Sequence, residues 1–418
     1  MVRGFLKLSK RLVMRTNPYR LTKYKTIYKI IKKGFRLAGV TSQYKYKGIS
    51  LKIVIPRIIH SKEQLTWDWS GTITNIKKYL GKYEIVEEQN IFYTFRMNMH
   101  KVLVRLGIRK SDMNMTYIKY AENQVHLSPK DVCLTFDEFP LSFPDNPVYI
   151  YQDLNLHYLI EGSQNNSQSF KYSGFQNVSA EILDSRMRKQ ERFYNQATGI
   201  FTMSKWFSDY LIAQQGIPAE KVHYVGAGTN MDNLLFEDSH KGRNKFLFIG
   251  KDFLRKGGDL VYNAFVYLQN NLMPEAELYI IGPSDAPMEF NNPNVYFLGN
   301  LPADNVQYYY NLCDVFVLPS RFEAFGIVFV EALCYGLPCI GRNLMEMPNL
   351  IQNNETGLLI PAEEENPQVL ADKMYNLIKD ESFFRNVQMK QDYYKAEYSW
   401  DTVAKRMISV MKQDLNQM

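Results

Sequence analysis

Two glutamates and a glycine lie where one expected strand passes through a loop into a helix. The strand is expected over Val315 to Leu318 and the helix over Ile327 to Tyr335. Glu323 falls in the loop, where Gly326 lets a ligand approach the backbone, and the unpaired N–H groups of the helix start can hold a diphosphate. The Glu331 carboxylate, inside the helix, can accept hydrogen bonds from a ribose diol. Two acids at this spacing are common, so the prediction rests on the surrounding strand, turn and helix.

Two lysines flank a glycine-rich turn after an earlier expected strand. That strand ends at Gly250, Lys251 follows it directly, and Lys256 precedes Gly257 and Gly258 ahead of the next expected helix. Either lysine alone would be an ordinary surface residue. Together they suit a diphosphate leaving group, because fixed positive charge stabilises the negative charge that develops as the group departs.

The elements that must carry these residues alternate between short β-branched strands and longer helices, which is typical of parallel α/β sheets. We expect an α/β protein with two Rossmann-like domains facing a central cleft, where ligands bind beyond the carboxyl ends of the strands.

A stretch rich in Ser, Asn and Gln from Glu161 to Gln176 predicts a mobile loop. The expected domains are residues 51–236 and 245–390, joined by a polar linker over 237–244 and followed by a C-terminal helix over 391–418 that could cross back to the first domain. The expected strands are 51–58, 83–86, 132–136, 148–152, 199–203 and 222–225 in the first domain and 246–250, 278–282, 295–298, 315–318 and 358–360 in the second.

The C-terminal half resembles the family 4 retaining glycosyltransferases of the GT-B fold. The segment from Asp314 to Leu333 is similar to the signature of that family, and the similarity continues through residues 334–340 and 347–360. The resemblance implies transfer of a sugar from a UDP- or GDP-linked donor to a glycan, lipid-linked or other hydroxyl acceptor, with retention of the anomeric configuration. It also implies that the reaction uses no cofactor and no metal ion at the diphosphate. The sequence agrees with the latter, since it contains no Asp-x-Asp motif.

The same resemblance assigns roles to individual residues. Glu323 and Glu331 match the paired glutamates of the family. Lys256 matches its lysine, and Lys251 stands where most members carry arginine. Glu323, Lys256 and Lys251 are therefore expected to act in catalysis, and the expected donor-binding residues, besides both lysines and Glu331, are Gly250, Gly282, Leu301, Ala324, Phe325 and Gly326.

The N-terminal half offers fewer candidates. Gly71, ahead of an expected helix over Ile73 to Leu80, is the best match for the glycine-rich turn that the family places after its first strand, although the usual paired glycines are absent. Asp153 follows the strand expected over 148–152 and is our candidate for the residue beside the anomeric carbon. His157, four positions on, is an alternative, although we favour a structural role for it.

Two other functions use a similar architecture. A sugar-nucleotide 2-epimerase would share the nucleotide site but would also need acid and base groups around the sugar, and the N-terminal half offers no convincing set. A catalytically weak, glycosyltransferase-like partner protein would have lost the site residues. The presence of both glutamates and both lysines argues against such decay.

All of the excess positive charge lies at the start of the chain. Residues 1–50 contain fourteen Lys or Arg and no Asp or Glu, whereas the rest of the chain holds 36 basic and 43 acidic residues. Apolar residues recur at helical spacing from Leu21 to Phe35 between the basic ones. We favour a basic helical arm on an anionic membrane surface. A helix packed on its own domain is the main alternative, and we expect no nucleic-acid partner.

Composition excludes several other classes of protein. The four cysteines form no C-x-x-C pair and lie near no histidine cluster, so we expect neither a disulfide framework nor a zinc site. No run of eighteen apolar residues occurs, and the first residues lack the apolar segment of a secretion signal. We therefore expect a cytoplasmic protein, peripheral at the cytoplasmic face of the membrane.

Overall fold

The computed structural model describes residues 50–59, 71–92, 99, 102–108, 122–136, 141, 143–230 and 243–417. Residues 50–418 form one compact unit. The arm predicted over residues 1–50 lies outside the described residues apart from Ser50, as does most of the linker predicted over 237–244. In the described part of the chain, no helix combines the length and the apolar character needed to cross a membrane.

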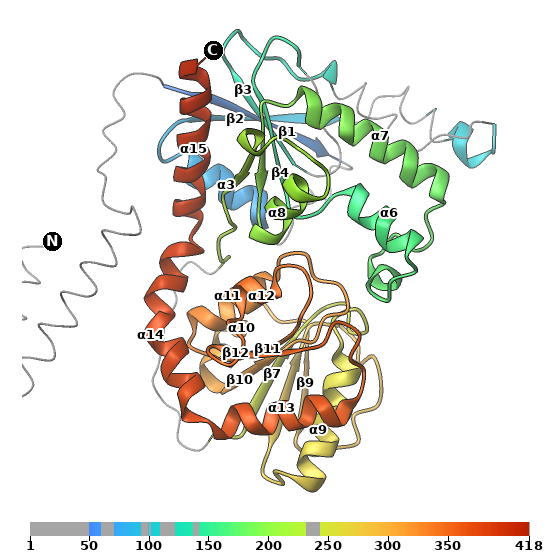
Figure 1. Cartoon of the computed structure of the whole chain (residues 1–418), viewed down its shortest axis with the longest axis vertical. Coiled ribbons are helices and arrows are strands. Elements are labelled where there is room, and N and C mark those ends of the chain that lie inside the picture. The colour runs from blue at the N-terminus through green and yellow to red at the C-terminus, as the bar shows by residue number, and fades with distance from the viewer. Residues whose placement is uncertain are drawn as a thin grey trace, which may run out of the picture. The chain divides into compact units, whose positions relative to one another are not determined.

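The N-terminal sheet has six parallel strands in the order β2-β1-β3-β4-β5-β6. Figure 1 labels β1, β2, β3 and β4 of this sheet. Alternate residues of a strand point to opposite faces, and β4 (Val148–Gln152) shows this alternation. Tyr149 packs in the core cluster with α3 (Thr72–Leu80) and α15 (Trp400–Gln417), whereas Ile150 packs with α7 (Ala180–Gln196) and α8 (Lys205–Ala213). The elements are β1 (Lys52–Ile59), α3 (Thr72–Leu80), β2 (Ile85–Phe92), β3 (Val132–Phe136), β4 (Val148–Gln152), α6 (Leu156–Gln164), η3 (Ser169–Tyr172), α7 (Ala180–Gln196), β5 (Gly199–Thr202), α8 (Lys205–Ala213), η4 (Ala219–Lys221) and β6 (Val222–Tyr224).

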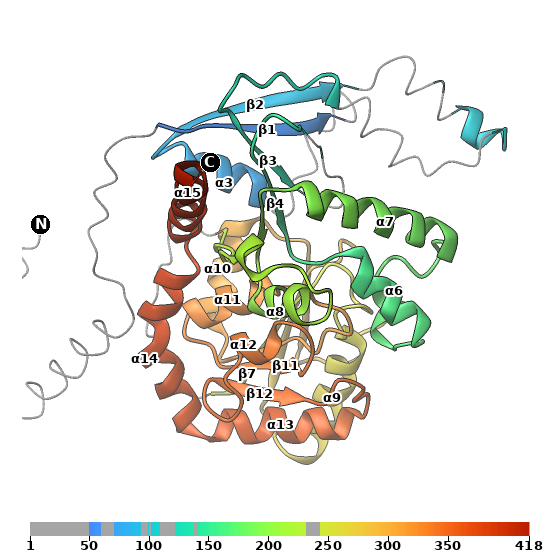
Figure 2. The same ribbon diagram turned by 45° about the horizontal axis from the view of Figure 1, so that its top comes forward.

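The C-terminal sheet also has six parallel strands, in the order β12-β11-β10-β7-β8-β9. Figure 2 labels β7, β11 and β12 of this sheet. Its central strands β7 and β10 are almost wholly buried, as expected for strands covered by helices on both faces. The elements are β7 (Lys245–Ile249), α9 (Gly258–Asn271), β8 (Glu277–Ile281), β9 (Val295–Gly299), α10 (Ala303–Leu312), β10 (Val315–Val317), α11 (Ile327–Cys334), β11 (Cys339–Arg342), α12 (Met347–Leu350), β12 (Gly357–Ile360) and α13 (Pro367–Lys379). The two sheets confirm the predicted α/β class with two Rossmann-like halves.

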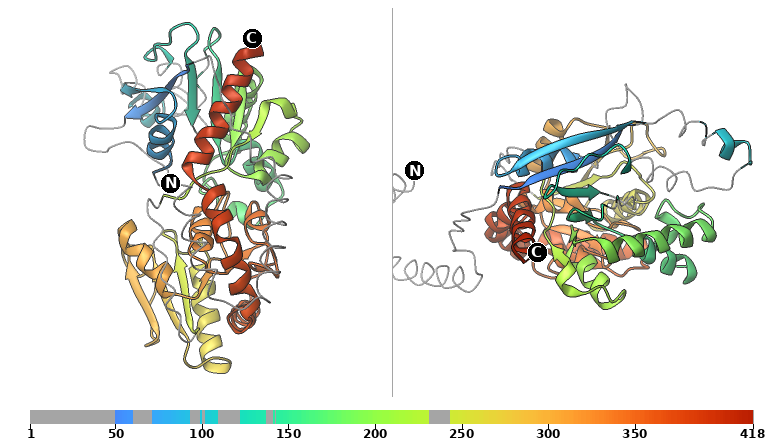
Figure 3. Two further views of the ribbon diagram at one scale, coloured as in Figure 1. Left: turned by 90° about the vertical axis from the view of Figure 1, so that its left-hand side faces the viewer. Right: turned by 90° about the horizontal axis from the view of Figure 1, so that it is seen from above.

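Two C-terminal helices follow the second sheet. Helix α14 (Glu381–Glu397) packs against α11, and α15 (Trp400–Gln417) packs against α3 of the first sheet (Figures 1 and 3). Tyr149 donates a hydrogen bond to Asp414 at 2.8 Å, and Lys412 forms an ion pair with Glu84. The end of the chain therefore ties the two halves together.

The second strand differs from the prediction. A strand was expected over residues 83–86, but β2 begins at Ile85 and runs to Phe92. The polar residues 87–90 do not show the apolar pattern of a strand, because β2 lies at the edge of the sheet and its side chains reach solvent or pair with neighbours. Glu87 lies 2.8 Å from Lys52, for example. A strand pattern based on buried residues misses an edge strand of this kind.

The mobile loop predicted over residues 161–176 is wrong. Helix α6 occupies its first part, and η3 forms within the polar stretch. The aromatic rings of Phe170 and Tyr172 pack against an apolar cluster that includes Phe322 and Ala324 of the C-terminal half. Tertiary packing, which the local composition does not reveal, orders this segment.

Candidate active site

The predicted site lies where the strand order of the C-terminal sheet reverses. Strands β7 and β10 are neighbours, but the chain leaves them toward opposite edges of the sheet. Ligands of open parallel sheets bind at such a point, beyond the carboxyl ends of the strands. The loop after β7 carries Lys251 and Lys256, and the loop after β10 carries Glu323.

Lys256 and Glu323 are brought together by these two loops. The Lys256 ammonium donates a hydrogen bond to the Glu323 carboxylate, and Ser320 Oγ lies 3.5 Å from the same oxygen. Both side chains of the ion pair are largely buried, with 14% of Lys256 and 13% of Glu323 exposed. An ion pair in this setting is much less screened by salt than one at the surface, and it holds the Lys256 ammonium group in place within the loop.

Three glycines let the loops approach each other. A Cβ at Gly282, after β8, would lie 2.2 Å from the carbonyl oxygen of Gly250, and a Cβ at Gly250 would lie 2.8 Å from Lys256. Gly257 has a φ of 74° and would meet the Pro319 carbonyl at 2.6 Å. No side chain fits at these positions, so the close packing of the β7, β8 and β10 loops depends on glycine.

Glu331 is buried on α11, which begins after Gly326 with its φ of 83°. Only 7% of Glu331 is exposed. Tyr310 donates a hydrogen bond to its carboxylate at 3.1 Å, and the backbone N–H of Asn230 donates another. Burial raises the pKa of Glu331 to about 7, although these two donors oppose the shift. The Glu331 carboxyl group therefore ionises near neutral pH, and it accepts hydrogen bonds as a full carboxylate only above that range.

Asp153 faces this site from the N-terminal sheet. It follows β4 directly and is half-buried. Burial and, to a smaller extent, the negative charge of Glu323 together raise the pKa of Asp153 to about 6, although a backbone hydrogen bond opposes the shift. The two carboxylates, one from each sheet, therefore lie close enough to interact electrostatically.

The contacts of His157 indicate a structural role for this residue. Its Nδ1 atom lies 2.7 Å from Tyr210 Oη, and Tyr210 donates a hydrogen bond to Glu161 at 2.6 Å. This chain of contacts joins α6 to α8 within the N-terminal half and leaves Asp153 as the candidate on that side.

The remaining predicted residues differ in what their side chains do. Lys251 is exposed, and Leu301 is half-buried in the loop between β9 and α10. Ala324 and Phe325 are buried in apolar clusters, so only their backbone groups are available to a ligand. Gly71, with a φ of 87°, precedes α3, and a Cβ there would lie 3.8 to 3.9 Å from the side chain of Asn230.

Sequence reasoning missed three residues around the site. Asn230 and Tyr310 hold Glu331, and Arg321 is buried beside the Glu323 loop. Nothing near Asn230 or Tyr310 in the sequence links them to Glu331. Arg321, two positions before Glu323, had one available signal, namely a second charged residue in the same loop.

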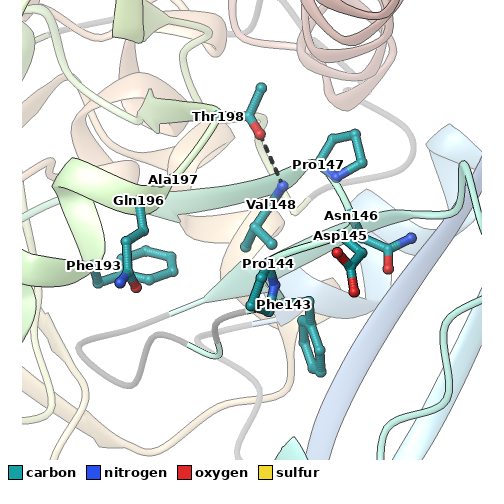
Figure 4. Close-up of a pocket in the computed structure, with 10 residues that line it drawn as sticks. All are labelled: Phe143, Pro144, Asp145, Asn146, Pro147, Val148, Phe193, Gln196, Ala197 and Thr198. Carbon is teal, nitrogen blue, oxygen red and sulfur yellow. Dashed lines mark hydrogen bonds between the residues drawn. The ribbon is translucent and has the colours of Figure 1, made fainter. Parts of the chain in front are cut away.

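A separate pocket lies at the other end of the N-terminal sheet (Figure 4). It has a volume of about 420 Å³ and is lined by Phe143, Pro144 and Phe193 together with the start of β4 at Val148. Asp153 follows the opposite end of the same strand, so this pocket is not part of the predicted site. In the described part of the chain, no group of three or more His, Cys, Asp or Glu residues is arranged to hold a metal ion.

Comparison with known proteins supports the same region. The family model of glycosyl transferases group 1 matches residues 232–414. An uncharacterized glycosyltransferase of Methanocaldococcus jannaschii is 26% identical over 236 residues, which cover 51% of this chain and 59% of that protein. A GDP-mannose-dependent alpha-(1-6)-phosphatidylinositol monomannoside mannosyltransferase of Mycobacterium tuberculosis is 30% identical over 131 residues, or 29% of this chain and 33% of that protein. The chain spans about half the length of the first curated relatives that it matches.

A solved structure shows the same fold over most of the chain. Sucrose-phosphate synthase from Thermosynechococcus elongatus superimposes with a TM-score of 0.61 at 16% identity, covering 88% of this chain and 100% of the other. Identity this low establishes the two-domain GT-B fold and nothing finer.

Proposed function

We propose, from the match of residues 232–414 to the glycosyl transferases group 1 family, that this chain transfers a sugar from a nucleoside-diphosphate donor to a hydroxyl acceptor. The observation that carries the proposal is the pairing of Lys256 with Glu323 where the sheet order reverses, with Glu331 buried on the helix that follows the Glu323 loop. A relative that is named as GDP-mannose-dependent adds support for a nucleotide-sugar donor, either UDP- or GDP-linked.

Each residue has a distinct role in this proposal. The Glu331 carboxylate binds the ribose diol, and the backbone of residues 324–326 with the start of α11 holds the diphosphate. Lys256, oriented by Glu323, and the exposed Lys251 stabilise the charge that develops on the diphosphate as the sugar leaves. Asp153 lies on the acceptor side, beside the anomeric carbon, and the anomeric configuration is retained.

The proposed chemistry uses no metal ion at the diphosphate and no cofactor. Two lysine ammonium groups and the N–H groups of the α11 start supply the positive potential that a divalent ion would otherwise supply.

The acceptor is proposed to be a glycan or a lipid-linked glycan at the cytoplasmic face of a membrane. The basic residues of the arm over 1–50 support contact with an anionic surface, because each one near such a surface contributes about 1 kcal/mol. The acidic remainder of the chain would be repelled by that surface, so the arm would supply the attraction.

A panel of nucleotide sugars tests the proposed activity. The protein is incubated with UDP-, GDP- and ADP-linked sugars, and release of the nucleoside diphosphate is measured. Lys256→Met should lower the rate of release from the active donor by about 10²-fold. Lys245→Met, which removes an ion pair at the opposite end of β7, is the matched control and should retain it. Equal release by both variants would refute the site assignment.

A further inference from the structure

Arg321 is buried between two carboxylates beside the proposed site. Its side chain is 6% exposed. Two of its nitrogens contact Asp259 at 2.7 and 3.0 Å, and two contact Glu365 at 2.9 and 2.5 Å. Arginine presents its donors in a planar fork that suits bidentate pairing, so both carboxylates hold the guanidinium in one orientation.

The same arginine joins the loop that carries Glu323 to the loop that carries Lys256. Its backbone N–H donates to the Arg255 carbonyl at 2.9 Å, and its Nη1 donates to the Leu254 carbonyl at 2.5 Å. In return, Arg255 Nη1 donates to the carbonyl of Phe322 at 3.1 Å. Asp259 lies in the first turn of α9, directly after the loop that carries Lys256. The residues flanking Lys256 are therefore bonded to the residues flanking Glu323.

Glu365 is itself fixed by a second buried arginine. Arg342, which is 1% exposed, donates to Glu365 at 3.1 Å and to the Pro319 carbonyl at 3.3 Å. Its Nη1 donates to the carbonyls of Ala362 and Glu364, both at 2.8 Å. The carboxylate that anchors Arg321 therefore has little freedom to move.

The N-terminal half also contacts this cluster. Gln168 donates a hydrogen bond to Glu365 at 3.2 Å, and the ring of Tyr172 lies 5.1 Å from the guanidinium carbon of Arg321. The cluster thus lies at the boundary between the two halves. Arg321 therefore contacts both site loops and the N-terminal half, which stabilisation of the C-terminal core alone would not require.

We propose that Arg321 is a positioning residue, which sets the distance between Glu323 and Lys256 by bonding their loops together. The proposal rests on the function proposed above. Misplacement of reacting groups by about 1 Å can cost about 10²-fold in rate, even when the altered residue does not contact the substrate. Loss of Arg321 should therefore affect the rate of transfer more than the binding of the donor.

Kinetics of three variants test the proposal. Arg321→Met should lower kcat by about 10²-fold, with a much smaller change in the KM for the donor. Arg321→Lys, which keeps the charge and loses the fork, should restore part of kcat. Lys245→Met, the control, removes a half-buried ion pair from the same sheet and should keep the wild-type kcat after correction for the folded fraction. If Arg321→Met loses activity only in proportion to its unfolded fraction, as Lys245→Met does, the proposal is overturned.

Hydrogen exchange provides a readout that does not depend on activity. Arg321→Met should speed amide exchange in residues 251–258 and 319–326 together, whereas Lys245→Met should leave both segments unchanged. Faster exchange in neither segment, or in one only, would also overturn the proposal. If the wild-type protein uses none of the nucleotide sugars, the proposed function fails, and the exchange measurement still decides whether Arg321 joins the loops.

Discussion

Replacing Glu331 by glutamine should stabilise the fold above neutral pH and weaken nucleotide binding at the same time. Burial raises the pKa of Glu331 to about 7 from its ordinary value of 4.5. Between these two values the folded state binds more protons than the unfolded state, so the contribution of Glu331 to the free energy of unfolding falls as the pH rises. Above the folded-state pKa, the protein carries the full cost of burying this charge.

The size of the effect follows from the shift. A difference of one in pKa corresponds to about 1.4 kcal/mol. The rise in the pKa of Glu331 from 4.5 to about 7 therefore predicts that the glutamine variant is about 3 kcal/mol more stable than wild type at about pH 8. Below about pH 4.5 the two proteins should be equally stable, because Glu331 is then neutral in both states. The amide oxygen of glutamine can still accept from Tyr310 and from the Asn230 N–H.

Nucleotide binding should change in the opposite direction. A hydrogen bond to a charged group is worth about 1.5–3 kcal/mol. Glutamine still offers a neutral acceptor, worth about 0.5–1.5 kcal/mol, so loss of the charge on Glu331 should cost about 1–1.5 kcal/mol and raise the Kd for the nucleoside diphosphate by about 5- to 13-fold. The same reasoning predicts that wild-type affinity falls as the pH decreases through about 7, because the carboxylate becomes protonated.

Two assays check this pair of effects. Denaturant unfolding across the pH range measures the stability difference, and titration calorimetry with UDP and GDP measures affinity. Glu355→Gln, which alters an exposed carboxylate of the same domain, is the control and should change neither quantity by much. A Glu331→Gln variant that is less stable than wild type at about pH 8, with unchanged nucleotide affinity, would refute the reasoning.

Four further predictions concern the rest of the proposed function. Lys256→Ala should lower kcat by about 10²-fold while nucleotide affinity changes less, measured by steady-state kinetics and calorimetry, because its charge matters most as the diphosphate departs. Asp153→Asn should impair transfer but not nucleotide binding, and unchanged kinetics of this variant would remove Asp153 from the site. Transfer by the wild-type protein should decline as the pH falls through about 6, because Asp153 becomes protonated. Transfer should continue in excess EDTA, and strict dependence on magnesium or manganese would contradict the proposed metal-free site. The full chain should co-sediment with anionic vesicles at low salt and less at high salt, and removal of residues 1–47 should abolish binding; a full chain that ignores such vesicles would show that the arm does not bind membrane.

Local patterns predicted the fold class and the core of the site. Glu323, Gly326 and Glu331 lie in one strand, loop and helix, so their relative positions follow from local geometry. Lys251 and Lys256 lie in a second unit of the same kind. The rule that ligands bind where the strand order reverses then brings the two units together.

Long-range contacts could not be predicted in the same way. Tyr310 reaches Glu331 across 21 residues, and Arg321 reaches its partners Asp259 and Glu365 across 62 and 44 residues. No local spacing encodes such pairs. The errors over β2 and over residues 161–176 have the same origin, because both segments take their structure from neighbours that are distant in the sequence.

The most direct test of the central claim is an NMR analysis of the product formed from the active nucleotide sugar and a hydroxyl acceptor. We predict a new glycosidic bond with the anomeric configuration of the donor, formed together with one nucleoside diphosphate per transfer and about 10²-fold more slowly by Lys256→Met. Conversion of the donor into an epimerised nucleotide sugar, or a donor left unchanged by the wild-type protein, would contradict the account.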